Sequence, residues 1–598
     1  MMRIVNQLRP GAARMSRLLC GALLAGAAAL MLVPVHAAAP GDSSSDLAVV
    51  PAGSAVVIHI KGLVGVKDRL LAYLDKAVPD QAAIAKGFID QAFEEGIDGR
   101  KPFKGLAKNG PIFIILPELP KPDQEEPLVL AFLKAENFNT FVEGAFKKEE
   151  RESMKKDGAI TALETENGRK LFLAEHKGFA AISNDKAQLK KALAATESMK
   201  IDEIQSAKLL ASDIGLYVGL DRLAKDYAEQ IKEGRKQIED GIKQAEEQLP
   251  KEQREQFAIV KDLVGPIFQA LEDSQGLAAT IDFKAEAIVL GLDTALRIDS
   301  PTSKSLGGLK PGTNTVMAGL PGGQMMYMGS TNNASLLKAA LPLLKKASPD
   351  AAKAIEATIA TLGNGAAASA VGIPLVGLDI REATNPAEAA KAALAYVENS
   401  LASPIGKTPV KGKPKITADA ATLSGIKFSK MVMEIDLESL TNQEGLPEEM
   451  KAGMAKAMKG LLGDKITVWV GNDEKRVFQI TAPTEQKAGE LLKQVMDAKS
   501  IVGSSEGFKV VRSNLPADAT LVALVDPVKY GSLIVNVLGD VMPGALPIPP
   551  GLGTVKNPKS TFFGASISLE PGRAGAQIAL PAATVNELVN VFAKPFLP

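Results

Sequence analysis

Two stretches of sequence decide the expected fold: GLYVGLD at residues 215–221 and LVALVDP at residues 521–527. Each is a short apolar run that ends in an aspartate, Asp221 or Asp526, where a helical pattern begins. Aspartate is a preferred residue at a helix N-cap, and proline, here Pro527, is favoured at the first helical position. The two stretches therefore predict the same unit, a strand that runs into a helix, once in each half of the chain.

Further pairs of elements recur in the same order in the two halves. The matching pairs are Pro51–Gly53 with Pro311–Thr313 before a strand, Leu128–Leu133 with Leu375–Ile380 before the helix caps Asn137 and Asn385, and the hairpin turn at His176 with the turn at Gly471–Asp473. The order is kept while the spacing varies, which is what duplication followed by loop insertion produces. The alternative is two unrelated series of common α+β units.

The fold class follows from the way strands and helices alternate. Short polar turns join neighbouring strand-like runs in the first half, which argues against a regular βαβ alternation. The sequence predicts an α+β fold of two tandem, duplicated halves, each an antiparallel or mixed sheet with helices on one face, and a helical hairpin inserted in the first half. The predicted segments are a signal peptide at 1–37, a first half at 45–300 and a second half at 301–598.

The N-terminus has the three parts of a secretory signal peptide. Its basic region contains four arginines and no acidic residue: Arg3, Arg9, Arg14 and Arg17. An apolar run at 18–35 and small residues around Ala37 follow, so we expect cleavage after Ala37 and an exported chain, periplasmic or extracellular. The alternative is an uncleaved membrane anchor. Cleavage removes Cys20, the one cysteine of the chain, so the mature protein has neither disulfide nor thiol chemistry.

Charge and composition exclude several classes of function. The 598 residues include 69 basic and 69 acidic side chains, and the loss of four arginines with the signal peptide leaves the mature chain mildly acidic. Such a chain lacks the positive field that nucleic-acid binding requires. No stretch after the signal peptide is apolar for long enough to span a bilayer. We therefore expect neither a nucleic-acid partner nor a membrane span in the mature chain.

A highly charged segment at residues 221–272 predicts the helical hairpin. One face of its first arm holds apolar or small residues at helical spacing: Tyr227, Ile231, Gly234, Ile238, Gly241 and Ala245. Glycine costs roughly 1 kcal/mol in a helix, so we expect its two glycines to allow close packing against another helix. The functional interpretation is an interaction arm, and the alternative is a helix packed on the protein's own sheet. The contacts of the predicted arm are Tyr227, Ile231, Ile238 and Phe257.

The second half contains a methionine stripe. Met450, Met454 and Met458 lie four residues apart, so they share one face of a predicted helix. Methionine adapts to irregular apolar surfaces, which suits a lipid or peptide site, and the alternative is a stripe that faces the core. Another methionine cluster, at residues 325–328, predicts a buried strand rather than a copper site, because no histidine or cysteine lies near it in the sequence.

A search for catalytic motifs finds no complete one. Gly503–Gly507 matches the GxSxG pattern, but it precedes an expected strand at 508–511, whereas the nucleophile elbow lies between a strand and a helix. The mature chain has two histidines, His59 and His176, which we expect at the surface and without the spacing of a zinc helix. Ser505 therefore lacks an evident base. We predict no catalytic residue, no metal site and no cofactor.

Three functions from different classes remain. The leading hypothesis is an exported, non-catalytic binding or scaffold protein whose partner is an unknown protein or an apolar ligand. The second is a carrier of an apolar ligand such as a lipid, which a continuous internal groove would support. The third is a hydrolase that uses carboxylates alone, which needs two acids at a suitable spacing in a cleft. The overall pattern resembles large exported bacterial proteins, without a motif specific to any family.

Overall fold

The computed structural model describes residues 46–94, 100–119, 126–248, 264–347, 349–402, 410–441, 447–541 and 561–594. The chain divides into two compact units. The first comprises the residues up to Arg235 together with 267–302 and 572–577, and the second comprises 236–266, 303–571 and 578–598. The predicted signal peptide lies outside the described residues.

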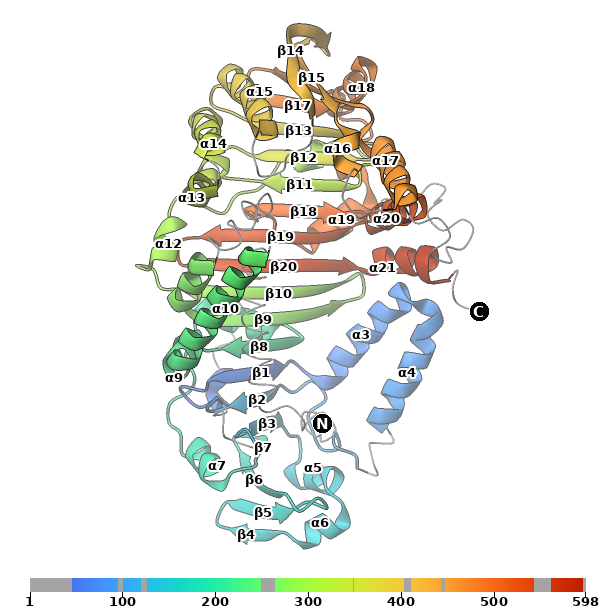
Figure 1. The fold of residues 1–598 in the computed structure, drawn as a ribbon. Coiled ribbons are helices and arrows are strands. Elements are labelled where there is room, and N and C mark those ends of the chain that lie inside the picture. Colours follow the sequence, from blue (N-terminus) through green and yellow to red (C-terminus); the bar gives the residue numbers. More distant parts are fainter. Residues whose placement is uncertain are drawn as a thin grey trace. The chain divides into compact units, whose positions relative to one another are not determined.

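The first unit is built on an antiparallel sheet (Figure 1). Its strands are β1 (Val56–Ile60), β2 (Ile112–Leu116), β3 (Leu130–Lys134), β4 (Lys155–Asp157), β5 (Ile160–Glu164), β6 (Lys170–His176), β7 (Phe179–Ser183), β8 (Ile214–Val218), β9 (Ser274–Lys284) and β10 (Ala287–Leu296). Their order in the sheet is β4-β5-β6-β7-β3-β2-β1-β8-β9-β10. The start of β20 (Arg573–Pro581) belongs to this unit as well, and β20 pairs with β10.

Short polar side chains cap several helices of the first unit. They are η1 (Asp46–Val49), α3 (Leu63–Ala77), α4 (Pro79–Glu94), α5 (Phe138–Ala145), α6 (Lys148–Glu152), α7 (Lys186–Leu193), α8 (Glu203–Ala211), α9 (Leu220–Asp226), the beginning of α10 (Ala228–Gln248) and the beginning of α12 (Pro301–Ser305). Asn137 caps α5 by accepting the N–H of Thr140 at 2.9 Å, and Asp185 caps α7 in the same way. Figure 1 shows α3 and α4 as a helical hairpin.

Antiparallel strands also form the sheet of the second unit. Its strands are β11 (Met326–Ser330), β12 (Ala367–Gly372), β13 (Val376–Glu382), β14 (Val410–Leu423), β15 (Ile426–Ile435), β16 (Lys465–Asn472), β17 (Arg476–Thr481), β18 (Leu521–Val525) and β19 (Phe563–Glu570). Their order is β14-β15-β16-β17-β13-β12-β11-β18-β19. The α+β class predicted from the sequence is therefore confirmed, and the neighbouring strands within each of the two strand orders are antiparallel.

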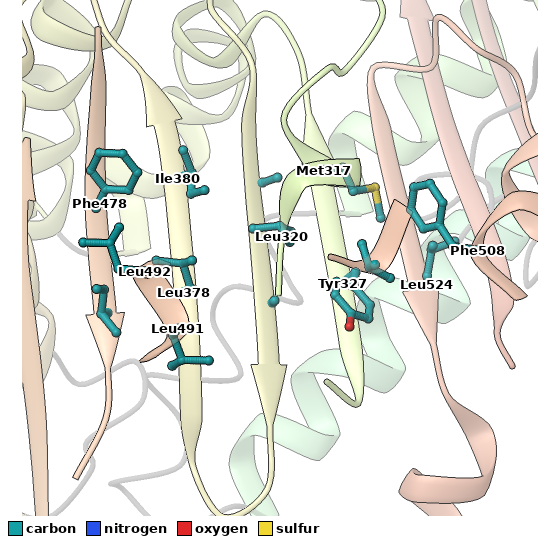
Figure 2. Packing of buried hydrophobic residues seen from close by; sticks show 14 of the residues in the cluster. Met317, Leu320, Tyr327, Leu378, Ile380, Phe478, Leu491, Leu492, Phe508 and Leu524 are labelled. Atoms are coloured by element: carbon teal, nitrogen blue, oxygen red, sulfur yellow. The ribbon is translucent and has the colours of Figure 1, made fainter. Parts of the chain in front are cut away.

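Helices cover both faces of the second sheet. They are η2 (Met317–Gly319), α13 (Asn333–Ala347), α14 (Pro349–Leu362), α15 (Pro386–Ala402), α16 (Leu437–Thr441), α17 (Glu448–Leu462), α18 (Glu485–Met496), η3 (Val502–Ser504), α19 (Glu506–Ser513), α20 (Pro527–Val541), α21 (Ala582–Leu588) and η4 (Val589–Ala593). On one face, Leu378 and Ile380 of β13 share a core with Leu491 of α18 (Figure 2). On the other, Val468 of β16 shares a core with Ala389 of α15. The prediction of helices on one face is thus too narrow for this unit, because its strands carry apolar residues on both sides.

The strand order of the second unit repeats that of the first, with each strand number raised by ten. The same distance along the chain separates β1 from β11, α3 from α13, and the first residues of α4 and α14, Pro79 and Pro349. The two units therefore have equivalent elements. Duplication as their origin stays a prediction.

One of the four sequence correspondences is wrong. The partner of the Pro51–Gly53 turn is Pro321–Gly323, not Pro311–Thr313, because Pro321–Gly323 is the turn that leads into β11. Gly53 and Gly323 also share a positive φ, 69° and 78°, which glycine adopts without strain. The other three correspondences fall on equivalent strands and helices.

Candidate functional site

The apolar stripe of the predicted arm is half-buried. Ile231 and Ile238 lie on α10, and Tyr227 directly precedes that helix as the C-cap of α9. Their side chains are neither fully exposed nor part of a closed core. Phe257, the fourth predicted contact, lies outside the described residues.

Within the first unit, the arm packs against the helical segment that precedes β9. The guanidinium of Arg235 lies 5.4 Å from the ring centroid of Phe268, and its Nη1 lies 3.8 Å from Oε1 of Glu272. Among the described residues, the expected close packing at Gly241 is not found, because a Cβ added there would meet nothing within 4 Å. The arm is therefore held near its base by Arg235, while no described residue packs closely on Gly241.

A cavity of about 600 Å³ lies beside the second half of α10. Most of its described lining residues are charged: Glu239, Asp240, Ile242, Lys243, Glu246, Glu247, Val264 and Gly265. Pockets for apolar ligands are lined mainly by hydrophobic and aromatic side chains. The described lining therefore does not support the apolar ligand of the carrier hypothesis.

The methionine stripe lies on α17, where the most buried residues are small ones. All three methionines are half-buried: Met450, Met454 and Met458. Gly453 and Ala457 are buried instead. A Cβ added to Gly453 would lie 2.2 Å from the carbonyl oxygen of Asp540 near the end of α20, so the backbones of α17 and α20 approach closely at this point. The packing leaves the methionines partly accessible.

Two helices expose large apolar side chains one turn apart. On α4, Ile84 and Phe88 are 63% and 71% exposed, and on α20, Tyr530 and Ile534 are 49% and 43% exposed. Each pair has i, i+4 spacing, which places its two side chains side by side on the helix surface. Both spacings are visible in the sequence, but a strip that faces the core has the same spacing, so neither pair was predicted.

One face of the first sheet carries a row of half-buried apolar residues. The row crosses β8, β1, β2, β3 and β7 in register: Leu216, Ile58, Ile114, Ala131 and Ile182. Adjacent residues such as Val57 and Ile115 are fully buried on the opposite face. Residues of α5 pack against part of the row. It is nevertheless the described feature that most resembles the apolar surface a carrier would need.

Four charged residues form a buried network in the first unit: Lys208 of α8, Asp293 of β10, Arg573 of β20, and Asp202, the N-cap of α8. Arg573 Nη1 lies 2.7 Å from Asp293 Oδ1, Arg573 Nη2 pairs with Asp202, and Lys208 pairs with Asp293. Burial alone would raise the pKa of Asp202, but hydrogen bonds from Arg573 and from two backbone N–H groups lower it. Because each charge in this network has an opposite partner, we assign the network a structural role.

The hydrolase hypothesis requires two neighbouring carboxylates, and among the described residues Asp213 and Asp282 come nearest to such a pair. They lie at adjacent ends of β8 and β9. Burial raises the pKa of Asp282, and the charge of Asp213 adds to the rise. Asp213 pairs with Arg69 and accepts the N–H of Phe283 at 2.8 Å. Thr520 accepts the equivalent N–H in the second unit. Asp213 therefore has a structural role that a threonine can fill, and we build no catalytic site on this pair.

The expectation that both histidines lie at the surface is wrong for His59. This side chain is 2% exposed on the same buried face of β1 as Val57, and its Nδ1 lies 3.0 Å from the carbonyl oxygen of Leu209. The strand alternation places it inside, where the carbonyl satisfies the ring nitrogen. His176 is half-buried, and burial lowers its pKa.

The GxSxG match lies at the start of a helix. Ser505 is the N-cap of α19, where its Oγ accepts the N–H of Phe508 at 3.2 Å and donates to the carbonyl of Val502 at 2.9 Å. The expected strand at 508–511 is wrong, because Phe508 and Val511 are the buried face of this helix. The short turn η3, not a strand, precedes Ser505, so the geometry of a nucleophile elbow is not formed here.

Metal and membrane features can be assessed for the described residues only. These residues contain no group of three or more His, Cys, Asp or Glu side chains placed to hold a metal ion. In the same part of the chain, no helix combines the length and the apolar character needed to cross a bilayer. Met328 of the cluster at 325–328 is 47% exposed, so the expectation of a buried strand is wrong for this residue.

Comparisons with known proteins add little to this geometry. No protein-family model and no curated protein matches the chain. Matching solved structures include crystal forms I and IV of TP0453, both with a TM-score of 0.21 and with 10% and 11% identity. They cover 43% and 42% of this chain and 80% of the TP0453 chain. At this similarity, the match supports no statement about function.

Proposed function

We propose that the protein is an exported, non-catalytic binding or scaffold protein. The observation that carries this proposal is the pair of exposed apolar strips, Ile84 with Phe88 on α4 and Tyr530 with Ile534 on α20. Contiguous exposed apolar surface on a soluble protein often marks a site of interaction. The signal-peptide pattern at residues 1–37 supports a periplasmic or extracellular partner.

The arm supplies a further candidate surface. Tyr227, Ile231 and Ile238 are half-buried on or beside α10, so a partner that covers them would bury apolar area that the monomer leaves partly in water. The remaining residues of α10 are mostly charged and exposed, which suits the polar rim that surrounds the apolar centre of an interface.

A carrier of an apolar ligand is the second candidate. Two observations favour it: the half-buried row that includes Ile58 and Ile114 on the first sheet, and the partly accessible methionines of α17. Methionine side chains adapt to ligands of irregular shape. The binding-protein proposal stays ahead because the strips on α4 and α20 are more exposed than either of these features.

Site-specific photo-crosslinking in the producing cells tests the proposal. A benzophenone amino acid replaces Phe88 or Ile534 in separate variants, and matched controls carry it at Lys86 or Asn536, two residues away on the same helices and therefore on other faces. We expect a discrete adduct in the exported fraction at Phe88, at Ile534 or at both, and none at the controls. A protein-sized adduct supports the binding protein, and a lipid-sized mass gain supports the carrier. Equal or absent adducts at all four positions contradict both.

A further inference from the structure

Each unit has a helical hairpin at an equivalent place in its order of elements. Comparing the two hairpins shows which side chains of α4 are exposed where those of α14 are covered. The α3–α4 hairpin follows β1, and the α13–α14 hairpin follows β11 at the same distance along the chain (Figure 1). Both α4 and α14 begin with Pro-Asp, at residues 79 and 349. Counted from that start, Phe88 of α4 corresponds to Thr358 of α14. The surroundings of these two residues can therefore be compared directly.

In the second unit, a third helix covers α14. Thr358 is only 9% exposed, and α14 packs against α15. Leu362 at the end of α14 shares a core with three alanines of α15: Ala389, Ala390 and Ala393. The cover is thus an amphipathic helix whose alanines lie in a core shared by α14 and the second sheet.

In the first unit, the equivalent cover is shortened. The counterpart of α15 is α5, which also follows the third strand of its unit, but α5 has 8 residues and α15 has 17. Ile84 and Phe88 on α4 are 63% and 71% exposed. A Cβ added at the neighbouring Gly87 would meet nothing within 4 Å, so a second backbone can approach α4 closely at this position.

We propose that α4 binds an amphipathic helix of a partner protein, whose small-residue face covers Ile84 and Phe88 as α15 covers α14. This inference rests on the proposed binding function and names the class of partner. The two residues of the strip are apolar, and their neighbours Gln81, Gly87 and Gln91 are uncharged, while Asp80, four residues before Ile84, is a charged neighbour at the N-terminal end. The strip therefore matches a face of alanines better than a charged face.

Two other occupants fit less well. The described chain resumes at Arg100, with five residues between it and Glu94 at the end of α4, and five residues make fewer than two helical turns. A second copy would present its own α4, whose exposed residues Ile84 and Phe88 are large, whereas the helix that covers α14 contributes alanines to the shared core. A helix with small residues on one face, supplied by a different protein, meets neither limit.

A fluorescence experiment on the mature chain, residues 38–598, tests the inference. The mature chain has no cysteine, so Gln81→Cys, one turn before Ile84, takes a single environment-sensitive label. The probe is a stapled helical peptide with the sequence of residues 386–402, and the control peptide carries Ala389→Glu and Ala393→Glu. We expect a saturable blue shift with the probe, weakened at least about tenfold by Phe88→Glu and unchanged by Lys86→Glu on another face of α4. Unchanged melting temperatures verify that both variants fold.

Each other outcome overturns the inference. The possibilities are no shift with the probe, an equal shift with the control peptide, or equal weakening by both substitutions. A label that is already shielded without peptide and indifferent to Phe88→Glu indicates cover by the chain's own residues. An emission that changes with protein concentration alone indicates a second copy. None of these results affects crosslinks to a native partner at Ile534, so failure of the inference is distinguishable from failure of the proposed function.

Discussion

Asp526 caps α20, and its burial disfavours the ionised form of its carboxyl group. The side chain is fully buried, and its Oδ1 accepts the N–H groups of Val528 and Lys529 at 3.2 and 3.1 Å. Burial raises the pKa of Asp526 despite these bonds and the nearby Lys529 ammonium. A carboxyl whose pKa is higher in the folded state destabilises the fold at pH values above its ordinary range, and the loss disappears as the pH falls. We expect Asp526→Asn, which keeps a capping oxygen, to raise the free energy of unfolding at pH 7 but not near pH 4.

Asp202 is the matched control, because it caps α8 but its pKa is lowered. A lowered pKa contributes stability above the ordinary range of the carboxyl and loses it as the pH falls through the folded-state value. Asp202→Asn should therefore destabilise the protein at pH 7, with a difference that shrinks in acid. Urea unfolding at both pH values measures the two variants, and effects of the same sign at pH 7 would contradict the assignment.

Arg573 stabilises the first unit by neutralising buried carboxylates. Its side chain is 11% exposed, and Asp293 beside it is 1% exposed. Removing one partner of a buried ion pair costs about 3–5 kcal/mol, because it leaves an uncompensated charge. We expect Arg573→Met to lower the free energy of unfolding by about that amount, because Asp202 then loses its cationic partner and Asp293 keeps only Lys208. As a control, Lys391→Met breaks an exposed pair with Glu388 and should change stability by less than about 1 kcal/mol.

Two glycines of α17 allow the effect of close packing on stability to be measured apart from the effect of helix propensity. Gly453 lies against the backbone near Asp540, whereas a Cβ added to Gly460 would meet nothing within 4 Å. Gly453→Ala should destabilise the second unit by about 1–3 kcal/mol through overpacking. Gly460→Ala should stabilise it by up to about 1 kcal/mol, because alanine is the better helix former. Equal effects of the two substitutions, measured by chemical unfolding, would show that α17 and α20 do not approach as described.

Helix α19 shows why local patterns identified some elements incorrectly. The run from Phe508 to Val511 suits a strand in isolation, because valine and phenylalanine favour strands. Its helical form depends on Ser505, which caps the first turn, and on the core of the second sheet, which takes Phe508 and Val511 on one face. Burial against the rest of the fold, rather than local preference, therefore makes residues 508–511 helical.

The candidate surface on α4 illustrates a different limit. The i, i+4 spacing of Ile84 and Phe88 is evident in the sequence, but whether a helix covers them depends on the length of α5 and on how the hairpin packs. The same holds for Arg573, which contacts Asp293 across 280 positions of sequence. Spacing within an element could be predicted, whereas contacts between distant elements could not.

At the scale of the whole chain, the sequence predicted the α+β class and the repeated order of elements but misplaced one turn. The sequence near Pro311 resembles the start of a strand because Thr313, Thr315 and Val316 are β-branched. The true strand β11 is rich in methionine and glycine, so its own signal is weak. Its place in the sheet comes from pairing with β12 and β18 on either side.

For the molecule as a whole, we predict that its N-terminal segment is cleaved off. The basic region, the apolar run and the small residues around Ala37 follow one another in the order of a signal peptide, so we expect the mature chain to begin at Ala38. Intact-mass analysis of the exported protein measures this. A product that retains Met1 would indicate an uncleaved anchor, and an Ala37→Leu variant, in which cleavage should be slowed, serves as the control.

Residues 572–577 belong to the first unit although they are synthesised after most of the second unit. The ribosome finishes the residues up to 302 long before it reaches Arg573, so Lys208 and Asp293 must wait for their third partner until residues 303–571 of the second unit have been made. A chain that stops at Pro571 would leave this unit unfinished, with faster hydrogen exchange at the backbone amides of β10 than in the full-length protein. Completion of the first unit thus requires that nearly all of the second unit has already been synthesised.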